Sequence, residues 1–310
     1  MTQLMKKVFI DGSAGTTGLQ IATRLRARND IELLTLSDEL RKDNAARKEI
    51  MNRADVVFLC LPDDAAREAV TLVENPDTAI IDASTAHRTS GGWVYGFPEI
   101  ANFREQIRKS KRIANPGCHA SGFIALVAPL ISAGIIRPDD ALSCFSLTGY
   151  SGGGKKMIAE YEDEGRNTLL DAPRLYGISQ KHKHLPEMVR YSGLSKAPVF
   201  CPIVAPFYSG MEAMVPLSDV SASIEEIADV YRSYYKDGLV FFAENADEQG
   251  FMSAGALEKR DDMQISVNGS EGRIVLTARF DNLGKGASGA AVQNLNLLLG
   301  VDEKTGLVTG

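Results

Sequence analysis

One cysteine stands where a thiol would be reactive. Cys118 follows a Pro-Gly turn at residues 116–117 and precedes the apolar run 123–130. This pattern predicts the first turn of a helix, where backbone N–H groups lack helical partners and the dipole is positive. Both features lower the pKa of a thiol and stabilise an oxyanion formed by attack on an acyl carbon. We interpret Cys118 as a covalent nucleophile; the alternative is a buried structural cysteine.

Two of the four histidines stand close together in a charged segment. His182 and His184 precede the Leu-Pro-Glu sequence of residues 185–187. A histidine beside a thiol nucleophile accepts its proton and returns a proton later in the reaction. The residues leave open whether His182 or His184 is the acid/base. The proline slightly favours His184, because it restricts the chain next to it.

A glycine-rich loop near the N-terminus has the spacing of a dinucleotide-binding turn. Gly12, Gly15 and Gly18 stand between a predicted strand at 7–11 and a helix at 19–28. Glycines let backbone N–H groups approach a pyrophosphate at a helix N-terminus. The alternative is a plain tight turn. The expected cofactor-binding residues of this loop are Gly12, Ser13, Ala14, Gly15, Thr16, Thr17 and Gly18.

The residues after the second strand favour NADP over NAD. Folds that bind NAD carry an acidic residue about 20 positions after the third glycine, where it takes the ribose hydroxyls. Here Ser37 is at that position, and the basic pair Arg41 and Lys42 follows. A serine and a basic pair suit a 2′-phosphate. The alternative is that Arg41 and Lys42 are ordinary solvated residues of a helix.

Two further loops combine anion-binding residue types. Ser84 and Arg88 follow the predicted strand 79–82, and Lys155 follows three glycines at 152–154. Loops at the C-terminal ends of parallel strands form the ligand crevice, and guanidinium binds phosphate or carboxylate in pairs of hydrogen bonds. We expect Arg88 and Lys155 to contact an anion. The alternatives are a surface loop and a flexible hairpin.

The elements around these motifs predict two domains. Apolar strands at 7–11, 31–36, 54–61 and 79–82 alternate with helices at 19–28, 41–51 and 63–73, the last capped by Asp63 or Asp64. This alternation predicts an α/β fold, a Rossmann-type doubly wound parallel sheet. Strands at 142–148, 199–205, 211–217, 264–269 and 273–280, with a helix at 224–236, predict an α+β catalytic domain with a mixed or antiparallel sheet.

A closing helix at 287–299 is expected to pack back on the first domain. We therefore expect a dinucleotide (NADP)-binding domain made of residues 1–117 and 286–310. Residues 118–285 are expected to form a domain for catalysis, substrate binding and oligomerisation.

Composition narrows the class of protein. The 310 residues are 44% hydrophobic and 24% charged, with a net charge of −6, which argues against nucleic acid as the main partner. No apolar run is long enough to cross a bilayer, and we expect no membrane partner. The four cysteines show no CxxC or Cys/His spacing, so neither a metal site nor a disulfide framework is predicted. We expect a soluble cytoplasmic protein with reduced thiols.

Taken together, the motifs resemble those of the N-acetyl-γ-glutamyl-phosphate reductases of arginine biosynthesis, in the shorter form of that family. The resemblance covers the chain from end to end, and its most specific parts are the Asn-Pro-Gly-Cys and His-x-His-x-Pro-Glu motifs. The matching segments are 12–18, 84–88, 95–99 (Tyr-Gly-Phe-Pro-Glu), 115–118, 150–155, 182–187 and 286–296.

The resemblance implies NADPH-dependent reduction of N-acetyl-γ-glutamyl phosphate to the semialdehyde, with release of inorganic phosphate. It implies Cys118 as the nucleophile, a histidine of 182–184 as the acid/base, and Asn282 and Gly284 near the nicotinamide. It also implies a homo-oligomer, a dimer or tetramer. The residues expected to bind the acyl phosphate substrate are Ser84, Arg88, Asn115, Ser151, Gly152, Lys155 and Glu187.

Two other hypotheses fit parts of the pattern. A related acyl-phosphate reductase, such as aspartate-semialdehyde dehydrogenase, would share the architecture and the thioester chemistry, but the His-x-His-x-Pro-Glu motif argues against it. A non-catalytic NADP-sensing Rossmann protein would not need a cysteine at a helix start together with a histidine pair.

Overall fold

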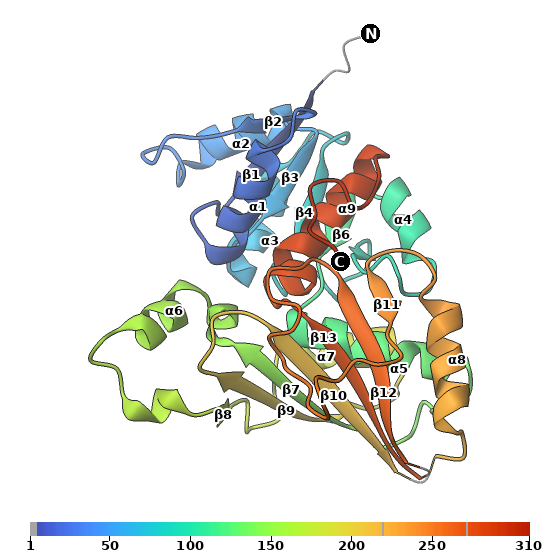
Figure 1. Cartoon of the computed structure of the whole chain (residues 1–310). Helices are drawn as coiled ribbons and strands as arrows, with labels where there is room; N and C mark the ends of the chain where they lie inside the picture. Colours follow the sequence, from blue (N-terminus) through green and yellow to red (C-terminus); the bar gives the residue numbers. More distant parts are fainter. Residues whose placement is uncertain (1–4, 219, 271) are drawn as a thin grey trace. The chain divides into compact units, whose positions relative to one another are not determined.

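The computed structural model describes residues 5–218, 220–270 and 272–310, so the first four residues of the expected NADP domain lie outside it. The chain forms two compact units (Figure 1). Unit 1 runs to Pro116 and resumes over Ala287–Leu307, and unit 2 comprises Gly117–Gly286 and Val308–Gly310.

Unit 1 contains a six-stranded sheet in the order β2-β1-β3-β4-β6-β5, and every strand pair in it is parallel. The middle strands β3 and β4 are buried at every residue, which explains their continuous apolar sequences. The strands are β1 Lys6–Asp11, β2 Ile31–Leu34, β3 Val56–Leu59, β4 Ala79–Asp82, β5 Val94–Tyr95 and β6 Arg112–Ala114. The helices are α1 Thr16–Arg26, α2 Asn44–Arg53, α3 Asp63–Leu72, α4 Phe103–Lys109 and α9 Gly289–Leu299.

Helices cover both faces of this sheet. One hydrophobic cluster joins strand residues such as Val8 and Phe58 to α1, α4 and α9. A second joins residues such as Val57 and Ile80 to α2 and α3. The predicted doubly wound, Rossmann-type α/β fold is confirmed, and α9 packs in unit 1 although it comes last in the chain.

Two local predictions in unit 1 are wrong. The N-cap of α3 is Pro62, not Asp63 or Asp64. The carboxylate of Asp63 instead accepts hydrogen bonds from the N–H (3.0 Å) and the hydroxyl of Thr85, which joins α3 to the loop after β4. Helix α2 begins at Asn44, because Asp43 caps it by accepting from the Ala46 N–H at 2.7 Å.

Unit 2 contains a seven-stranded mixed sheet in the order β11-β12-β13-β10-β7-β9-β8. The β7–β9 and β11–β12 pairs are parallel and the other pairs are antiparallel, so the predicted α+β class with a mixed sheet is confirmed. The strands are β7 Ser143–Gly149, β8 Arg174–Leu175, β9 Val199–Ala205, β10 Met211–Ser218, β11 Val240–Phe242, β12 Met263–Ser270 and β13 Arg273–Phe280. The helices are α5 Cys118–Ser132, α6 Gly154–Glu162, α7 Leu185–Ser192 and α8 Ile224–Tyr234.

Helix α5 begins at Cys118 and is the buried central helix of unit 2. Gly122 lets it lie close to the sheet, because a Cβ there would be 2.7 Å from the Cβ of Ala213. Pro129 has no N–H to offer the carbonyl of Ala125, and the Tyr235 hydroxyl donates to that oxygen instead, at 2.7 Å. These contacts fix the helix that carries the candidate nucleophile.

No helix in the described residues has the length and apolar character needed to cross a membrane.

Candidate active site

The glycine loop of unit 1 has the expected geometry for close backbone approach. Gly12 has φ +85°, and a Cβ there would lie 2.3 Å from the carbonyl oxygen of Cys60. A Cβ at Gly18 would lie 2.5 Å from the carbonyl oxygen of Gly12. Both positions therefore require glycine, and the loop folds tightly onto the start of α1.

The N-terminus of α1 fits a bound phosphate. Its N-cap is Gly15, which has no side chain to satisfy the first N–H groups of the helix. The Thr16 hydroxyl oxygen is buried and has no hydrogen-bond partner within the described residues. Ser13 and Ala14 are exposed. An unpartnered hydroxyl and free helix N–H groups suit the pyrophosphate of a dinucleotide.

A pocket of about 460 Å³ extends from this loop along the end of β2. It is lined by Gly12, Ser13 and Ala14 from the loop and by Arg41 and Lys42 from the segment after β2. Ser37 is not among the described residues that line the pocket. Its side chain is exposed, and its carbonyl oxygen accepts hydrogen bonds from the N–H groups of Leu40 and Arg41.

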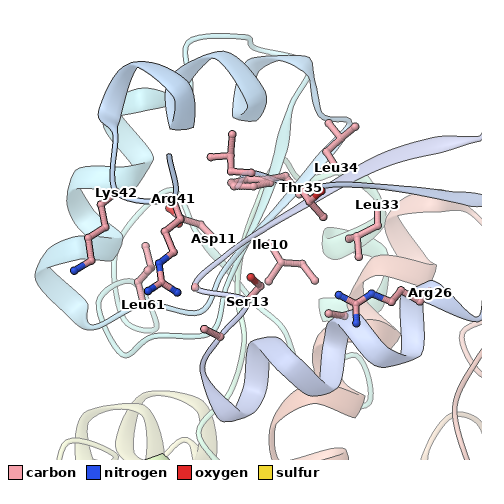
Figure 2. Close-up of a pocket in the computed structure, with 15 residues that line it drawn as sticks. Ile10, Asp11, Ser13, Arg26, Leu33, Leu34, Thr35, Arg41, Lys42 and Leu61 are labelled. Carbon is pink, nitrogen blue, oxygen red and sulfur yellow. The ribbon is translucent and has the colours of Figure 1, made fainter. Parts of the chain in front are cut away.

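Figure 2 shows a third basic residue at this pocket, Arg26 on α1, which sequence reasoning missed. The helical periodicity placed it in the last turn of α1, but only the fold brings its side chain to the pocket, near Leu33 of β2 (Figure 2). The acidic lining residue, Asp11, is neutralised by an ion pair with Arg47 at 2.8 Å, and burial raises its pKa. The pocket is thus positively charged, as a 2′-phosphate requires.

The polar residues after β4 are held within unit 1. The Ser84 hydroxyl donates to the carboxylate of Asp82 at 2.8 Å. Arg88 is buried, and its Nε donates to the Asn115 carbonyl at 2.9 Å. The Asn115 amide donates to the carbonyl of Ala287 at 3.0 Å. These contacts tie the ends of β4 and β6 to the start of the α9 segment.

In unit 2, Cys118 is the first residue of α5, as predicted, and its N-cap is Gly117. The Gly117 N–H donates to Oε2 of Glu187 at 3.1 Å. A Cβ at Gly286 would lie 3.0 Å from the Cβ of Cys118, so the segment after β13 passes directly beside the nucleophile. Glu187, predicted to bind substrate, therefore holds the start of the helix.

The same carboxylate faces one of the candidate acid/base residues. Nε2 of His184 lies 4.0 Å from Oε1 of Glu187, and both side chains are buried. The His184 N–H donates to Nδ1 of His182 at 3.2 Å, and the two rings lie 4.7 Å apart. Glu187 thus connects the start of α5 to the histidine pair.

A third histidine, His119, belongs to this cluster, and sequence reasoning missed it. Its ring lies 5.7 Å from that of His184 and 5.8 Å from that of His182. Its Nδ1 lies 2.8 Å from the Ser146 hydroxyl and its Nε2 lies 2.6 Å from the Tyr176 hydroxyl. The signal in the sequence was its position next to Cys118, which puts it in the same helical turn.

The glycine-rich segment after β7 forms a short 3-10 helix, Tyr150–Gly153, before α6. The Asn282 amide joins it to the segment after β13: its Nδ2 donates to the Ser151 hydroxyl at 3.0 Å, and its Oδ1 accepts from the Gly210 N–H at 2.9 Å. Gly152 and Lys155 are exposed, and Lys155 lies in the first turn of α6.

Gly284, expected near the nicotinamide, is required by packing within unit 2. A Cβ there would lie 2.0 Å from the carbonyl oxygen of Arg260. The Gly284 N–H donates to the Asp281 carboxylate at 3.1 Å. The next residue, Lys285, is buried.

Two family models match the chain. "Semialdehyde dehydrogenase, NAD binding domain" matches residues 7–110, and "Semialdehyde dehydrogenase, dimerisation domain" matches residues 118–282. Solved structures of aspartate semialdehyde dehydrogenase share the fold. The type II enzyme of Vibrio cholerae matches with a TM-score of 0.72 at 17% identity, over 96% of this chain and 99% of its own. The enzyme of Candida albicans, solved with NADP, matches with a TM-score of 0.70 at 16% identity, over 95% and 98%.

Sequence relatives are much closer. The chain is 45% identical to N-acetyl-gamma-glutamyl-phosphate reductase 2 of Nostoc sp., over 97% of this chain and 99% of the relative. It is 46% identical to N-acetyl-gamma-glutamyl-phosphate reductase of Chelativorans sp., over 94% and 98%. The chain therefore belongs to the N-acetyl-γ-glutamyl-phosphate reductase family, within the semialdehyde dehydrogenases.

Proposed function

We propose that this protein reduces N-acetyl-γ-glutamyl phosphate to N-acetylglutamate 5-semialdehyde with NADPH, releasing inorganic phosphate, as a step of arginine biosynthesis. The observation that carries the proposal is the placement of Cys118 at the start of α5, where Glu187 accepts from the N-cap N–H of that helix and also faces His184. The relatives at 45% identity over nearly the whole chain carry the name of this activity.

Cys118 is the nucleophile in this mechanism. Its thiolate attacks the acyl carbon, the bond to phosphate breaks, and a thioester forms. N–H groups in the first turn of α5 stabilise both the thiolate and the oxyanion of the tetrahedral intermediate. Gly286 keeps the segment beside Cys118 free of a side chain.

His184 or His182 is the acid/base. NADPH, when bound, supplies a hydride to the thioester carbon. The histidine donates a proton to the resulting thiohemiacetal oxygen and takes it back as the C–S bond breaks, which releases the aldehyde and returns the Cys118 thiolate. The buried Glu187 carboxylate faces His184 and stabilises its protonated form during this step. We therefore assign Glu187 to orienting this pair instead of to substrate contact.

The dinucleotide-binding residues are those of the glycine loop and the basic pocket. Gly12 to Gly18 and the buried Thr16 hydroxyl would hold the pyrophosphate, and Arg41 and Lys42 the 2′-phosphate. Ser37 would contribute indirectly, because its carbonyl accepts from the Arg41 N–H and so fixes the turn that positions Arg41. We also propose that Asn282 and Gly284 shape the nicotinamide end of the site.

The substrate has a phosphate and a carboxylate. Lys155 is an exposed cation at a helix start and suits one of these groups, with Ser151 and Gly152 in the preceding turn. Ser84, Arg88 and Asn115 complete the proposed substrate set. Their observed contacts hold the ends of β4 and β6, so they are expected to act partly by fixing these loops.

We make two further proposals, one on assembly and one on location. Unit 2 matches a dimerisation domain, and we propose a homo-oligomer, a dimer or tetramer. As an enzyme of amino-acid biosynthesis with no paired cysteine motif, it is proposed to work in the cytoplasm.

The decisive assay is phosphate-dependent reduction of NADP⁺ by N-acetylglutamate 5-semialdehyde. We expect turnover with this aldehyde and none with aspartate semialdehyde. Turnover with aspartate semialdehyde alone would assign the chain to the other reductase, and no turnover with either aldehyde would reject both activities.

A further inference from the structure

Strand β8 covers only part of the outer edge of β9, because it is two residues long. At that edge Val204 pairs with Arg174, and the carbonyl of Pro202 accepts from the Tyr176 N–H at 3.0 Å. Alternate residues of a strand present their backbone groups to the same neighbour, so Phe200 is the next residue of β9 to face this side. The chain has left the strand by then, and Phe200 needs another partner.

The side-chain amide of Gln180 is that partner. Its Nε2 donates to the Phe200 carbonyl at 2.7 Å, and its Oε1 accepts from the Phe200 N–H at 2.9 Å. A primary amide has the donor and the acceptor of a peptide group, so it satisfies both backbone groups of one strand residue. The side chain of Gln180 thus takes the place of a paired strand residue.

The backbone of Gln180 is in an unusual conformation. Its φ is +54°, in the left-handed region that residues other than glycine, asparagine and aspartate seldom adopt. Its N–H donates to the carbonyl of Gly177 at 3.0 Å, and Gly177 has φ +62°. Such a conformation persists where the surrounding contacts hold it, often near functional sites. The two hydrogen bonds to Phe200 are contacts of this kind.

The loop held in this way carries the histidine pair. A Cβ at Gly177 would lie 3.6 Å from Cδ2 of His182, so the loop closes on itself. The His182 ring packs edge-on against the Phe200 ring at 5.1 Å, and its Nδ1 accepts from the His184 N–H. Phe200 therefore contacts the loop twice, with its backbone at Gln180 and with its ring at His182. Loss of the Gln180 contacts would loosen the loop on the N-terminal side of the histidines.

We propose that Gln180 is a positioning residue for the acid/base histidine: its amide fastens the loop between β8 and α7 to the edge of β9 and so fixes where His182 and His184 lie. The inference rests on the proposed function in that a histidine of this pair is the acid/base. An acid/base must lie within hydrogen-bond reach of the proton that it moves, so a small displacement of the loop lowers the rate.

Two substitutions of Gln180 separate the amide from the backbone conformation. Gln180→Met keeps a long side chain and the unfavourable positive φ but loses both hydrogen bonds. Gln180→Gly also loses them, but glycine adopts a positive φ readily. An effect that both variants share therefore reports on the amide. Ser179→Ala, at the neighbouring exposed residue of the same loop, is the control.

The first measurement is the rate at which diethyl pyrocarbonate acylates each histidine, followed by mass spectrometry of the peptides. His184 is 5% exposed, which protects it in the wild type. We expect its acylation to be about fivefold to tenfold faster in both Gln180 variants, because the loop opens more often. His87 of unit 1, whose Nδ1 lies 2.6 Å from the Asp82 carboxylate, is the internal reference and should react at an unchanged rate.

The second measurement is steady-state kinetics with the semialdehyde. We expect kcat to fall roughly tenfold in both Gln180 variants, with the KM for NADP⁺ within about twofold of the wild type, because cofactor binding does not depend on the loop. Ser179→Ala should match the wild type in both measurements. Thermal unfolding identifies a variant that fails to fold, and if Gln180→Met fails, Gln180→Gly decides the matter alone.

Unchanged acylation of His184 in both variants would overturn the proposal. An effect confined to Gln180→Met would also overturn it, because the backbone conformation and not the amide would then be responsible. So would faster acylation with an unchanged kcat. Acylation needs neither NADPH nor substrate. A wild type that turns over neither aldehyde would therefore reject the proposed function, while the acylation rates would still show whether Gln180 fixes the histidines.

Discussion

Unit 1 and unit 2 each place a helix N-terminus at the candidate chemistry, and the two are built differently. Both α1 and α5 begin after a glycine N-cap without a capping side chain. Before α1, Ser13 and Ala14 are exposed and the Thr16 hydroxyl has no partner within the described residues. In the first turns of α5, by contrast, residues 119–122 are all buried, and Glu187 takes the N-cap N–H.

The difference shows how a helix N-terminus can serve either ligand binding or covalent catalysis. An open N-terminus leaves its N–H groups for an exchangeable ligand such as a pyrophosphate. A closed N-terminus has its polar groups fixed before the reaction, which favours a developing charge without reorganisation. The surroundings of the helix, and not the helix itself, decide between binding and covalent catalysis.

The largest expected effect comes from removing the nucleophile of the closed N-terminus. We expect Cys118→Ser to lower kcat by about a thousandfold or more, because a serine hydroxyl is not ionised at the start of α5. Cys201→Ser is the matched control, since Cys201 lies half-buried on β9. Steady-state kinetics with the semialdehyde would check this. Substantial turnover in Cys118→Ser would contradict the covalent mechanism.

The second prediction tests what closes α5. Glu187→Gln keeps an oxygen for the Gly117 N–H but removes the charge that faces His184. We expect kcat to fall roughly tenfold to a hundredfold with little change in the KM for NADP⁺, since the histidine loses support for its protonated form. A rise in the KM for the semialdehyde with an unchanged kcat would instead indicate that Glu187 binds the substrate.

The third prediction tests the open N-terminus. In Gly12→Ala the Cβ would meet the Cys60 carbonyl at 2.3 Å, so the loop must move. We expect the KM for NADPH to rise about tenfold or more, with a smaller change in the alkylation rate of Cys118. Gly92→Ala is the control, because Gly92 also has a positive φ (+80°) but no atom within 4 Å of a Cβ, among the residues that the structure describes.

If Gly12→Ala and Gly92→Ala weaken NADPH binding equally, the close approach of the Cys60 carbonyl to Gly12 does not determine the shape of the loop. Fluorescence titration with NADPH separates binding from turnover in both variants.

The smallest effect concerns selectivity within the open site. We expect Arg41→Ala and Arg26→Ala each to weaken NADPH binding by several-fold up to about tenfold, while NADH binding stays nearly unchanged, since only NADPH carries the 2′-phosphate. Arg53→Ala removes an exposed guanidinium of α2 that pairs with Glu49, and it serves as the control. Equal losses for both cofactors would place these arginines outside the phosphate site.

Sequence reasoning succeeded where the signal is local. The glycine loop, the helix that begins at Cys118 and the alternation of strands and helices are each read within a short window, because turns and periodicity involve neighbours in the chain. The 182–187 segment was expected near Cys118 because a thiol nucleophile is commonly activated by a histidine, and its Glu187 does accept from the N–H of Gly117, the residue before Cys118.

The missed features depend on contacts between distant segments. His119, Ser146 and Tyr176 come from α5, β7 and the residues after β8, and nothing in their local sequence indicates that they meet. Arg26 reaches the pocket only through the packing of α1 against β2. Asp63 was predicted as a possible helix cap, but its carboxylate accepts hydrogen bonds from the N–H and hydroxyl of Thr85, in the loop after β4.

The order in which the elements of unit 1 are translated affects how this unit folds during synthesis. All six strands of its sheet are translated before Pro116, but Val292 and Leu295 of α9, which share a hydrophobic cluster with Val8 and Phe58, are translated only after residues 117–286 of unit 2. Until α9 leaves the ribosome, part of one sheet face lacks its cover and stays open to chaperones or aggregation. A chain shortened before Gly289 would keep every strand of unit 1 and still fail to bury that face.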